Sequence, residues 1–548
     1  MKVMSSNDRW NWQMKASASP RCPTRSVGQA LPPANRWFLA ALCLSLSGCV
    51  VGPKYHAPST AQAPPAYKEL NPPPNQPAPL AEPAADPTLG GLGDWKVASP
   101  QDALPHGKWW EIYHDAELNT LENQLNIDNQ NIKQFFENFM AARALVREAR
   151  SQFFPTATVG ASYSRSRGSA NLGNNIGSTG TTSGKGSTGL IEFPLDVSWE
   201  PDLWGRVRNM VRQAQYTAQV SAADLENERL TEQASLATFF FELRGQDALR
   251  QILDATVAQD QKALELTQSQ YDLGLTDRIA VVQAETTLQS AQAQATNLGV
   301  ARAQFEHAIA LLVGKAASDF SLPVKPVLTT PPPIPVGLPS ELLERRPDIA
   351  AAERTMAAAN AQIGVATAAF YPNLSISASA GFESSAWKKI FSWPSRFWSV
   401  GPSVSETIFD AGLRRATVNQ FVAVYNADLA AYRQTVLAGF QQVEDALAAV
   451  RILTQQIQQQ HQAVESARVA LDLELKRYET GIDPYIDVVT EQNALLSAQQ
   501  ILALVEIQRM TQSVSLIEAL GGGWDRSELA SPQQVTAKPA KADTTIQQ

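Results

Sequence analysis

The stretch RYETGIDPYIDVV, residues 477–489, decides the fold, because the chain contains nearly the same stretch twice. The earlier copy begins at Tyr271 and reads YDLGLTDRIAVV, so Tyr271 and Tyr478 stand 207 positions apart. The same offset relates Gly205 to Gly412 and Gly314 to Gly521. A repeat of this length predicts two copies of one structural unit within the 548 residues.

Long stretches without proline predict long helices in both copies. Residues 204–271 and 411–478 contain no proline and are rich in Ala, Gln, Leu and Glu. These are good helix formers, and each stretch would reach about 100 Å at 1.5 Å per residue. Shorter helices are expected after each turn, at about 277–313 and 485–520, and before each first strand, at about 115–153 and 340–370. The chain would therefore run down one long helix and return on two short ones.

Two segments show the alternation of a strand with one apolar face. In IEFPLDVSWE, residues 191–200, apolar side chains alternate with Glu192, Asp196 and Glu200, and NLSISASAGF, residues 373–382, alternates likewise. Four strands are predicted, at about 156–167, 189–201, 373–383 and 397–409. Such segments are typical of outer-membrane barrels, which need at least eight strands. Two chains would supply eight and three would supply twelve, and a channel favours three because an eight-stranded barrel is filled by its own side chains.

The N-terminal region predicts export and lipid attachment. Residues 1–48 end in a short apolar run typical of a signal peptide, and the tetrapeptide before and including Cys49, LSGC, resembles a bacterial lipobox. Residues 49–105 are rich in Pro and Ala and predict an extended tether. The first repeat is then 106–320, a Pro-rich crossover is 321–340, the second repeat is 341–524, and 525–548 is expected to be a disordered tail.

Composition and motif searches argue against several classes of function. The net charge of −8 gives the chain no electrostatic reason to bind nucleic acid. The five His form no metal-ligand cluster, and no nucleophile motif occurs, so we expect neither an enzyme, nor a metal site, nor a cofactor other than lipid on Cys49. No segment after the signal is apolar enough for a transmembrane helix.

The motifs together resemble a known family. They are LSGCVVGPKYHAP (46–58), WWEIYHDAELNTL (109–121), FFPTATV (153–159), ERRPDIAAAE (344–353), FYPNLSIS (370–377), IFDAGLRR (408–415) and RYETGIDPYIDVV (477–489). With these motifs the chain resembles an outer-membrane efflux factor of the TolC-like superfamily, in its NodT-type lipoprotein branch.

The resemblance implies a mainly α fold with β structure. The duplicated unit would form a trimer in which a twelve-stranded transmembrane β-barrel continues into a long periplasmic α-helical barrel. It also implies three kinds of contact beyond the homotrimer: the outer-membrane lipid, a periplasmic adaptor (membrane fusion) protein, and through it an inner-membrane pump of the RND type. The expected function is the exit duct of a tripartite efflux pump.

The two copies differ in charge at their turns. Asp487, Asp483 and Arg477 stand where the first copy has Ala280, Thr276 and Gln270. A ring of such carboxylates around a threefold axis would attract cations, and its carboxylates would repel one another. Arg477 and Tyr478 would be the hydrogen-bond donors that keep this end of the channel closed. The resemblance also implies a gate at this end, while the alternative is that Asp487 is a simple helix cap.

The turns themselves predict a docking surface. Gly274 and Gly481 allow the chain to reverse, and the neighbouring residues Leu275, Thr276 and Ile482 are apolar or small at an end that faces water. The alternative is an ordinary helix-hairpin loop.

For the function of the whole protein, three interpretations compete. They are an efflux duct, an export channel for proteins or signalling molecules, and a purely structural envelope scaffold. The polar face of the strands favours a channel.

Overall fold

Long helices dominate the computed structural model, which describes residues 50–57, 64, 66–70, 107–167, 187–326, 330–337 and 339–537. All of them belong to one unit, residues 48–548. The helices are α2 (Ala116–Asp128), α3 (Gln130–Ser151), α4 (Arg206–Asp272), α5 (Arg278–Leu312), α6 (Leu342–Arg345), α7 (Pro347–Ala368), α8 (Leu413–Glu479), α9 (Tyr485–Ala519) and α10 (Pro532–Thr536). The strands are β1 (Thr156–Val159), β2 (Ser162–Ser166), β3 (Thr188–Trp199), β4 (Asn373–Ser384) and β5 (Arg396–Ser405).

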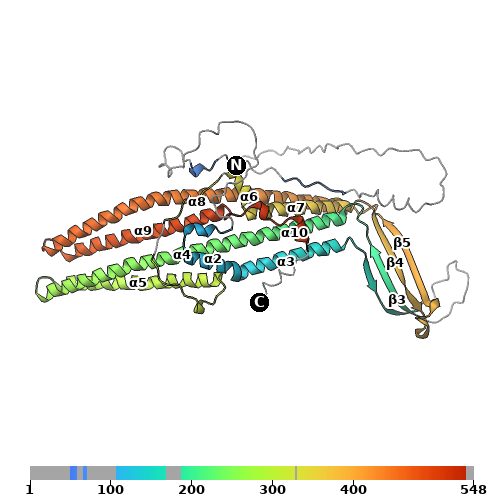
Figure 1. Ribbon diagram of the computed structural model, residues 1–548, viewed down its shortest axis with the longest axis horizontal. Coiled ribbons are helices and arrows are strands. Elements are labelled where there is room, and N and C mark those ends of the chain that lie inside the picture. The colour runs from blue at the N-terminus through green and yellow to red at the C-terminus, as the bar shows by residue number, and fades with distance from the viewer. Residues whose placement is uncertain are drawn as a thin grey trace, which may run out of the picture. The chain divides into compact units, whose positions relative to one another are not determined.

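The two long helices confirm the repeat. Helices α4 and α8 contain 67 residues each, and each begins directly after a glycine with positive φ, Gly205 at 81° and Gly412 at 89°. Helices α5 and α9 contain 35 residues each and pack against α4 and α8 as hairpins (Figure 1). Helices α3 and α7 contact the other halves of α4 and α8. One long helix therefore lies beside two short ones, as predicted.

The sheet follows the predicted strands with one interruption. Its order is β1-β3-β4-β5, all antiparallel, and β2 pairs with β3 in the register that β1 begins. The first predicted strand, 156–167, is thus divided into β1 and β2 at Gly160. The Gly160 N–H donates to the Pro194 carbonyl oxygen at 3.0 Å, but Pro194 has no N–H to return the bond. The ladder weakens there for that reason.

The last strand is shorter than predicted. The sequence pattern extended it to residue 409, but β5 ends at Ser405, which pairs with Asn373 at the start of β4. Pro372 precedes Asn373, so no ladder partner remains. Beyond Ser405 the backbone turns instead, because the Asp410 carboxylate accepts from Gly412 N–H at 3.0 Å and from Arg414 N–H at 3.2 Å.

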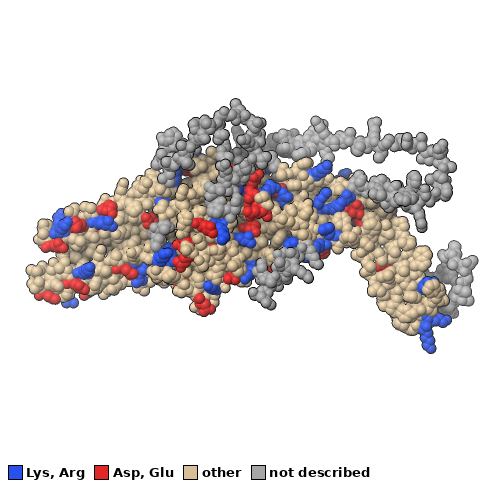
Figure 2. Space-filling model, viewed as in Figure 1, with Lys and Arg blue, Asp and Glu red and all other residues tan. Residues whose placement is uncertain are grey.

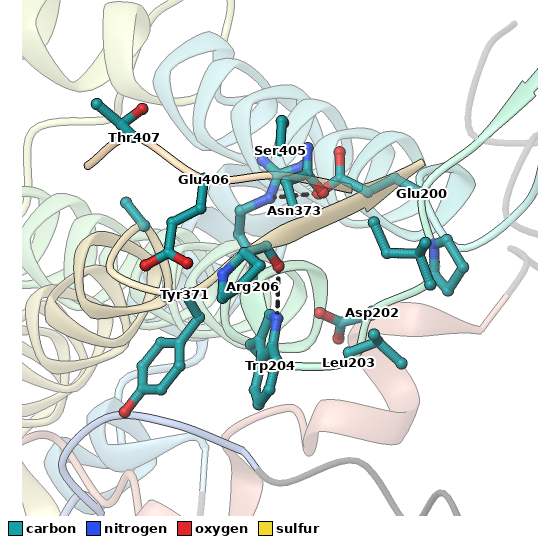
Figure 3. A pocket seen from close by; sticks show the side chains of 15 residues that line it. Glu200, Asp202, Leu203, Trp204, Arg206, Tyr371, Asn373, Ser405, Glu406 and Thr407 are labelled. Atoms are coloured by element: carbon teal, nitrogen blue, oxygen red, sulfur yellow. Dashed lines mark hydrogen bonds and ion pairs between the residues drawn. The ribbon is translucent and has the colours of Figure 1, made fainter. Parts of the chain in front are cut away.

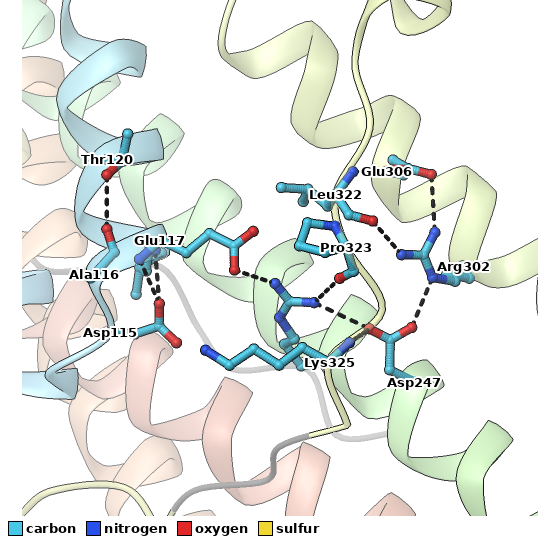
Figure 4. Close-up of polar contacts among 12 residues, drawn as sticks. Asp115, Ala116, Glu117, Thr120, Asp247, Arg302, Glu306, Leu322, Pro323 and Lys325 are labelled. Atoms are coloured by element: carbon cyan, nitrogen blue, oxygen red, sulfur yellow. Dashed lines mark hydrogen bonds and ion pairs between the residues drawn. The ribbon is translucent and has the colours of Figure 1, made fainter.

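A buried ionic network holds the start of the crossover against the helices (Figure 4). Asp247 of α4 is 1% exposed and accepts from Arg302 Nε of α5 at 2.8 Å, from Arg244 Nη1 at 3.2 Å and from the Lys325 backbone N–H at 2.9 Å. Arg244 also donates to the Pro323 carbonyl oxygen at 2.7 Å and to Glu117 of α2 at 2.5 Å. One network of ion pairs and hydrogen bonds therefore joins three helices and the crossover.

The described parts of the predicted tether, residues 49–105, contact the helices. The Val51 N–H donates to the Trp204 carbonyl oxygen at 3.0 Å, and the Tyr55 hydroxyl bonds Glu353. Tyr67 is 1% exposed, and the Lys68 N–H donates to Glu444 of α8 at 2.7 Å. Single aromatic residues and free backbone groups between the prolines are enough to dock a segment that cannot form its own core.

The prediction of a disordered tail from residue 525 was wrong up to residue 537. Helix α10 has a capping box, in which the Ser531 hydroxyl accepts from Gln534 N–H and the Gln534 side chain accepts from Ser531 N–H. Val535 is fully buried against α3 and α4. Residues 538–548 lie outside the described part of the chain. Within the described residues, no helix has the length and apolarity needed to cross a bilayer.

Candidate functional site

The two hairpin turns have the same backbone geometry. In the first, Gly274 has φ 71°, its N–H donates to the Tyr271 carbonyl oxygen at 2.9 Å, and Leu275 N–H donates to the Gln270 carbonyl oxygen at 2.8 Å. In the second, Gly481 has φ 75° and the equivalent bonds are 2.9 Å and 3.0 Å. The glycines close both helices in the left-handed conformation, as predicted from the sequence.

Both turns expose apolar side chains. Leu275 is 74% exposed and Ile482 is 67% exposed, and apart from the chain neighbours of each glycine, no described atom lies within 4 Å of where a Cβ would stand on Gly274 or Gly481. Thr276 is partly exposed beside them. The structure therefore places the predicted tip residues at the exposed ends of the two hairpins. That a partner covers them stays a prediction.

Among the described residues, three carboxylates come close together at the second turn and not at the first, which carries Asp272, Asp277 and Arg278. Arg477 Nη2 donates to Asp483 at 3.0 Å, and carboxylate oxygens of Glu474, Asp483 and Asp487 lie within 4.8 Å of one another. We call Glu474, Arg477, Asp483 and Asp487 the tip cluster. The hydrogen bond with Asp483 raises the pKa of Arg477, and burial together with Asp483 raises the pKa of Glu474. Figure 2 shows basic and acidic side chains side by side at the hairpin ends.

Tyr478 lies apart from the tip cluster. Its hydroxyl donates to Gln270 Oε1 of the first hairpin at 2.5 Å, and its ring lies 5.4 Å from that of Tyr485. Gln270 is the counterpart of Arg477 in the first copy. Tyr478 therefore links the two hairpins of one chain, whereas Arg477 binds its own turn.

Sequence reasoning missed Glu474, and it named Gln270 only as the counterpart of Arg477, not as a partner of Tyr478. Glu474 could have been found by the same comparison of the two copies, because it corresponds to Thr267 at the offset of 207 and is also a gain of charge in the second copy. Cys49, the predicted lipidation site, lies outside the described residues.

The opposite end of the helices joins the sheet through aromatic packing (Figure 3). Trp204 stacks on Tyr371 with ring centroids 5.0 Å apart, and its Nε1 donates to the Pro372 carbonyl oxygen at 2.7 Å. Arg206 pairs with Glu200 at 2.9 Å, beside a cavity of about 230 Å³. These contacts hold the junctions between the helices and the strands in place. We assign no ligand to the cavity.

Comparisons with known proteins agree with this arrangement. The family model described as "Outer membrane efflux protein" matches residues 121–315 and 338–522. The antibiotic efflux pump outer membrane protein ArpC of Pseudomonas putida is 31% identical over 505 residues, which cover 92% of this chain and 98% of that protein.

Solved structures show the same fold. The outer-membrane channel OprN is 28% identical, with a TM-score of 0.73 and coverage of 87% of this chain and 100% of that one. The open state of the MtrE channel of Neisseria gonorrhoeae is 25% identical, with a TM-score of 0.69 and coverage of 87% and 99%. The fold is that of TolC-like outer-membrane channels, with a periplasmic helical domain and a β domain, and the chain belongs to the outer membrane efflux protein family, whose members form the outer-membrane channel of tripartite pumps.

Proposed function

We propose that three copies of this chain form an efflux duct that is gated at the tip cluster. The sheet supports the assembly. Neither of its edges, β1 with β2 on one side and β5 on the other, pairs with another described strand, and an open edge cannot lie in lipid. Three such sheets, each with four strand positions, would close into a barrel of twelve strands.

The two faces of the sheet support a wet interior. Cross-strand register places a set of exposed apolar side chains on one face: Val159, Leu195, Trp398, Val400 and Val404. The other face carries Glu192 opposite Glu383, and Asp196 opposite Ser379. An apolar outer face with a polar inner face is the pattern of a water-filled barrel.

The charge difference between the two turns carries the proposal of a gate. Two hairpins with the same backbone geometry differ in that, among the described residues, three carboxylates lie within 4.8 Å of one another, beside an arginine, at the second turn and not at the first. A requirement of the fold alone would apply to both turns. Around a threefold axis the second turn would place nine carboxylates near the duct, where their mutual repulsion favours opening and the Arg477 and Tyr478 contacts favour closure.

Asp487→Ala should weaken the block of the channel by multivalent cations. The substitution removes one carboxylate per chain from the duct and leaves the Arg477–Asp483 pair in place. The measurement is single-channel conductance of the purified trimer in a planar bilayer, titrated with a trivalent cation. Block with unchanged affinity would assign Asp487 to helix capping and place the constriction elsewhere.

The exposed apolar tips support docking of a periplasmic adaptor. Ile482→Glu should reduce chemical crosslinking to the adaptor and raise the drug susceptibility of cells, because a charge replaces apolar surface that the adaptor would bury. The trimer should persist, and Ile482→Val, which keeps the tip apolar, is the matched control. Normal crosslinking of the glutamate variant would count against docking at this tip.

Lipidation of Cys49 anchors the duct in the outer membrane in this proposal, since the LSGC tetrapeptide resembles a lipobox. Cys49→Ser should abolish labelling of the protein by an alkyne fatty-acid probe. The two other cysteines precede the cleavage point, so they leave with the signal. Labelling that survives the substitution would disprove this assignment.

A further inference from the structure

A buried carboxylate lies where the two hairpins meet. Asp260 of α4 is 2% exposed, and its Oδ2 has no hydrogen-bond partner among the described residues. It lines two cavities, one of about 200 Å³ between α4, α5 and α9 and one between α4, α8 and α9. Gln492 of α9 lines both cavities as well, and its buried Oε1 also has no described partner.

The first of these cavities is rich in oxygen acceptors. Three threonines that line it donate their hydroxyl protons back to their own helices: Thr256 to the Ile252 carbonyl at 3.1 Å, Thr286 to Val282 at 2.8 Å and Thr287 to Gln283 at 3.0 Å. Their remaining lone pairs are then available to a bound group. Gln294 and Asn493 complete the polar lining with amides that can present an oxygen.

The charged groups around Asp260 leave it uncompensated. Arg468 and Asp472 of α8 line the second cavity, but Arg468 pairs with Glu465 at 2.7 Å and Asp472 pairs with Lys476. Tyr485 of α9 is the other titratable neighbour. Burial raises the pKa of Asp260 to about 6, and burial with the negative charge of Asp260 raises the pKa of Tyr485 to about 12. At neutral pH the carboxylate is therefore ionised and buried, and no basic side chain of the described residues pairs with it.

Comparison of the two copies shows that this polar lining is not a requirement of the hairpin fold. At the offset of 207, alanine occupies the positions that correspond to Thr256, Asp260 and Thr287, namely Ala463, Ala467 and Ala494. The second copy builds the same pair of long helices without them. A buried carboxylate that the fold does not need, and that destabilises it when unpaired, points to a ligand.

We propose that the cavity between α4, α5 and α9 binds a small hard cation of the Na⁺, Ca²⁺ or Mg²⁺ class, with Asp260 as its charged ligand and Gln492 and the threonine hydroxyls as neutral oxygen ligands. Such cations prefer oxygen ligands, and carboxylate, amide and hydroxyl oxygens from three helices fit that preference. The bound cation would cross-link the first hairpin to the second, above the tip cluster. The inference stands on Asp260 and its cavity and does not depend on the proposed gate.

Thermal unfolding of the full-length protein in detergent tests this site. Protein with Asp483→Asn and Asp487→Asn serves as the background, so that cations bound by the tip cluster do not contribute. After chelation, CaCl₂, MgCl₂ or NaCl is added at pH 7.5, with choline chloride keeping the ionic strength constant. We expect a saturable rise in the unfolding midpoint with at least one of the three, and equilibrium dialysis should count one such cation per chain.

Asp260→Asn should weaken the binding by roughly tenfold or more, because it removes the charged ligand. In choline chloride buffer without added Na⁺, Ca²⁺ or Mg²⁺, the same variant should unfold at a higher temperature than its parent, since it carries no unpaired buried charge. Thr287→Val keeps the charge and should weaken binding less, and Asp254→Asn, an exposed position on the same helix, should behave like the parent. Equal shifts in the parent and Asp260→Asn, or no saturable shift with any of the three cations, would overturn the proposal.

Discussion

Replacing Arg477 by serine and Tyr478 by phenylalanine together should raise the resting conductance of the purified trimer by about tenfold or more. Each chain loses the Arg477–Asp483 pair at the second turn and the 2.5 Å bond from Tyr478 to Gln270. The Tyr478 bond joins the two hairpins, and three such bonds per trimer at about 1 kcal/mol each exceed the roughly 1.4 kcal/mol that a tenfold change in the open population requires. Freed of Arg477, the carboxylates of the tip cluster also repel one another more strongly.

The measurement is single-channel recording in a planar bilayer at fixed salt. Lys476→Ser is the matched control, because Lys476 is one residue from Arg477, is 64% exposed and pairs with Asp472 rather than with the tip cluster. Its conductance should stay that of the wild type. If the double variant conducts like this control, the duct is closed by residues other than Arg477 and Tyr478.

Asp247→Asn should lower the free energy of unfolding by about 3–5 kcal/mol, the range for a buried ion pair that loses one partner. The asparagine has the same shape but leaves Arg244, which is 3% exposed, and Arg302 with one negative charge fewer between them. The backbone bond to Lys325 also weakens, so the start of the crossover should detach from α4 and α5.

Heat resistance of the trimer and limited proteolysis within residues 321–337 report the two effects. Asp254→Asn is the control. Asp254 lies on the same helix in an ion pair with Arg250 in which both side chains are about half exposed, and such surface pairs contribute about 0–1 kcal/mol. Equal stability of the two variants would show that the network in Figure 4 contributes no more than a surface pair.

The sequence predicted the helical hairpins well because their signals are local and repeated. Absence of proline, a glycine at each turn and a constant offset placed both ends of α4 and α8 within about two residues of the structure. The misses were contacts between distant segments. Docking of Tyr67 onto α8 and of Val535 onto α3 and α4 depends on grooves that form only in the folded protein.

The same reason explains what was missed at the functional sites. Comparison of the two copies found Arg477, Asp483 and Asp487, because a gain of charge is visible in the sequence alone. Asp260 also differs between the copies, but its interest lies in being buried beside Gln492, which is 232 positions away and on another hairpin. Residue type and spacing do not reveal such a pairing.

The two turns finally bear on how many partner molecules one duct can hold. Both turns present the same glycine geometry and an exposed apolar residue, Leu275 or Ile482, but within the described part of the chain a cluster of three carboxylates forms at the second alone. A partner that recognises shape finds two equivalent positions per chain, hence six around a trimer, whereas a partner that recognises charge finds three. The number of partner molecules bound per trimer would therefore reveal whether the partner recognises the shape of the turn or its charge.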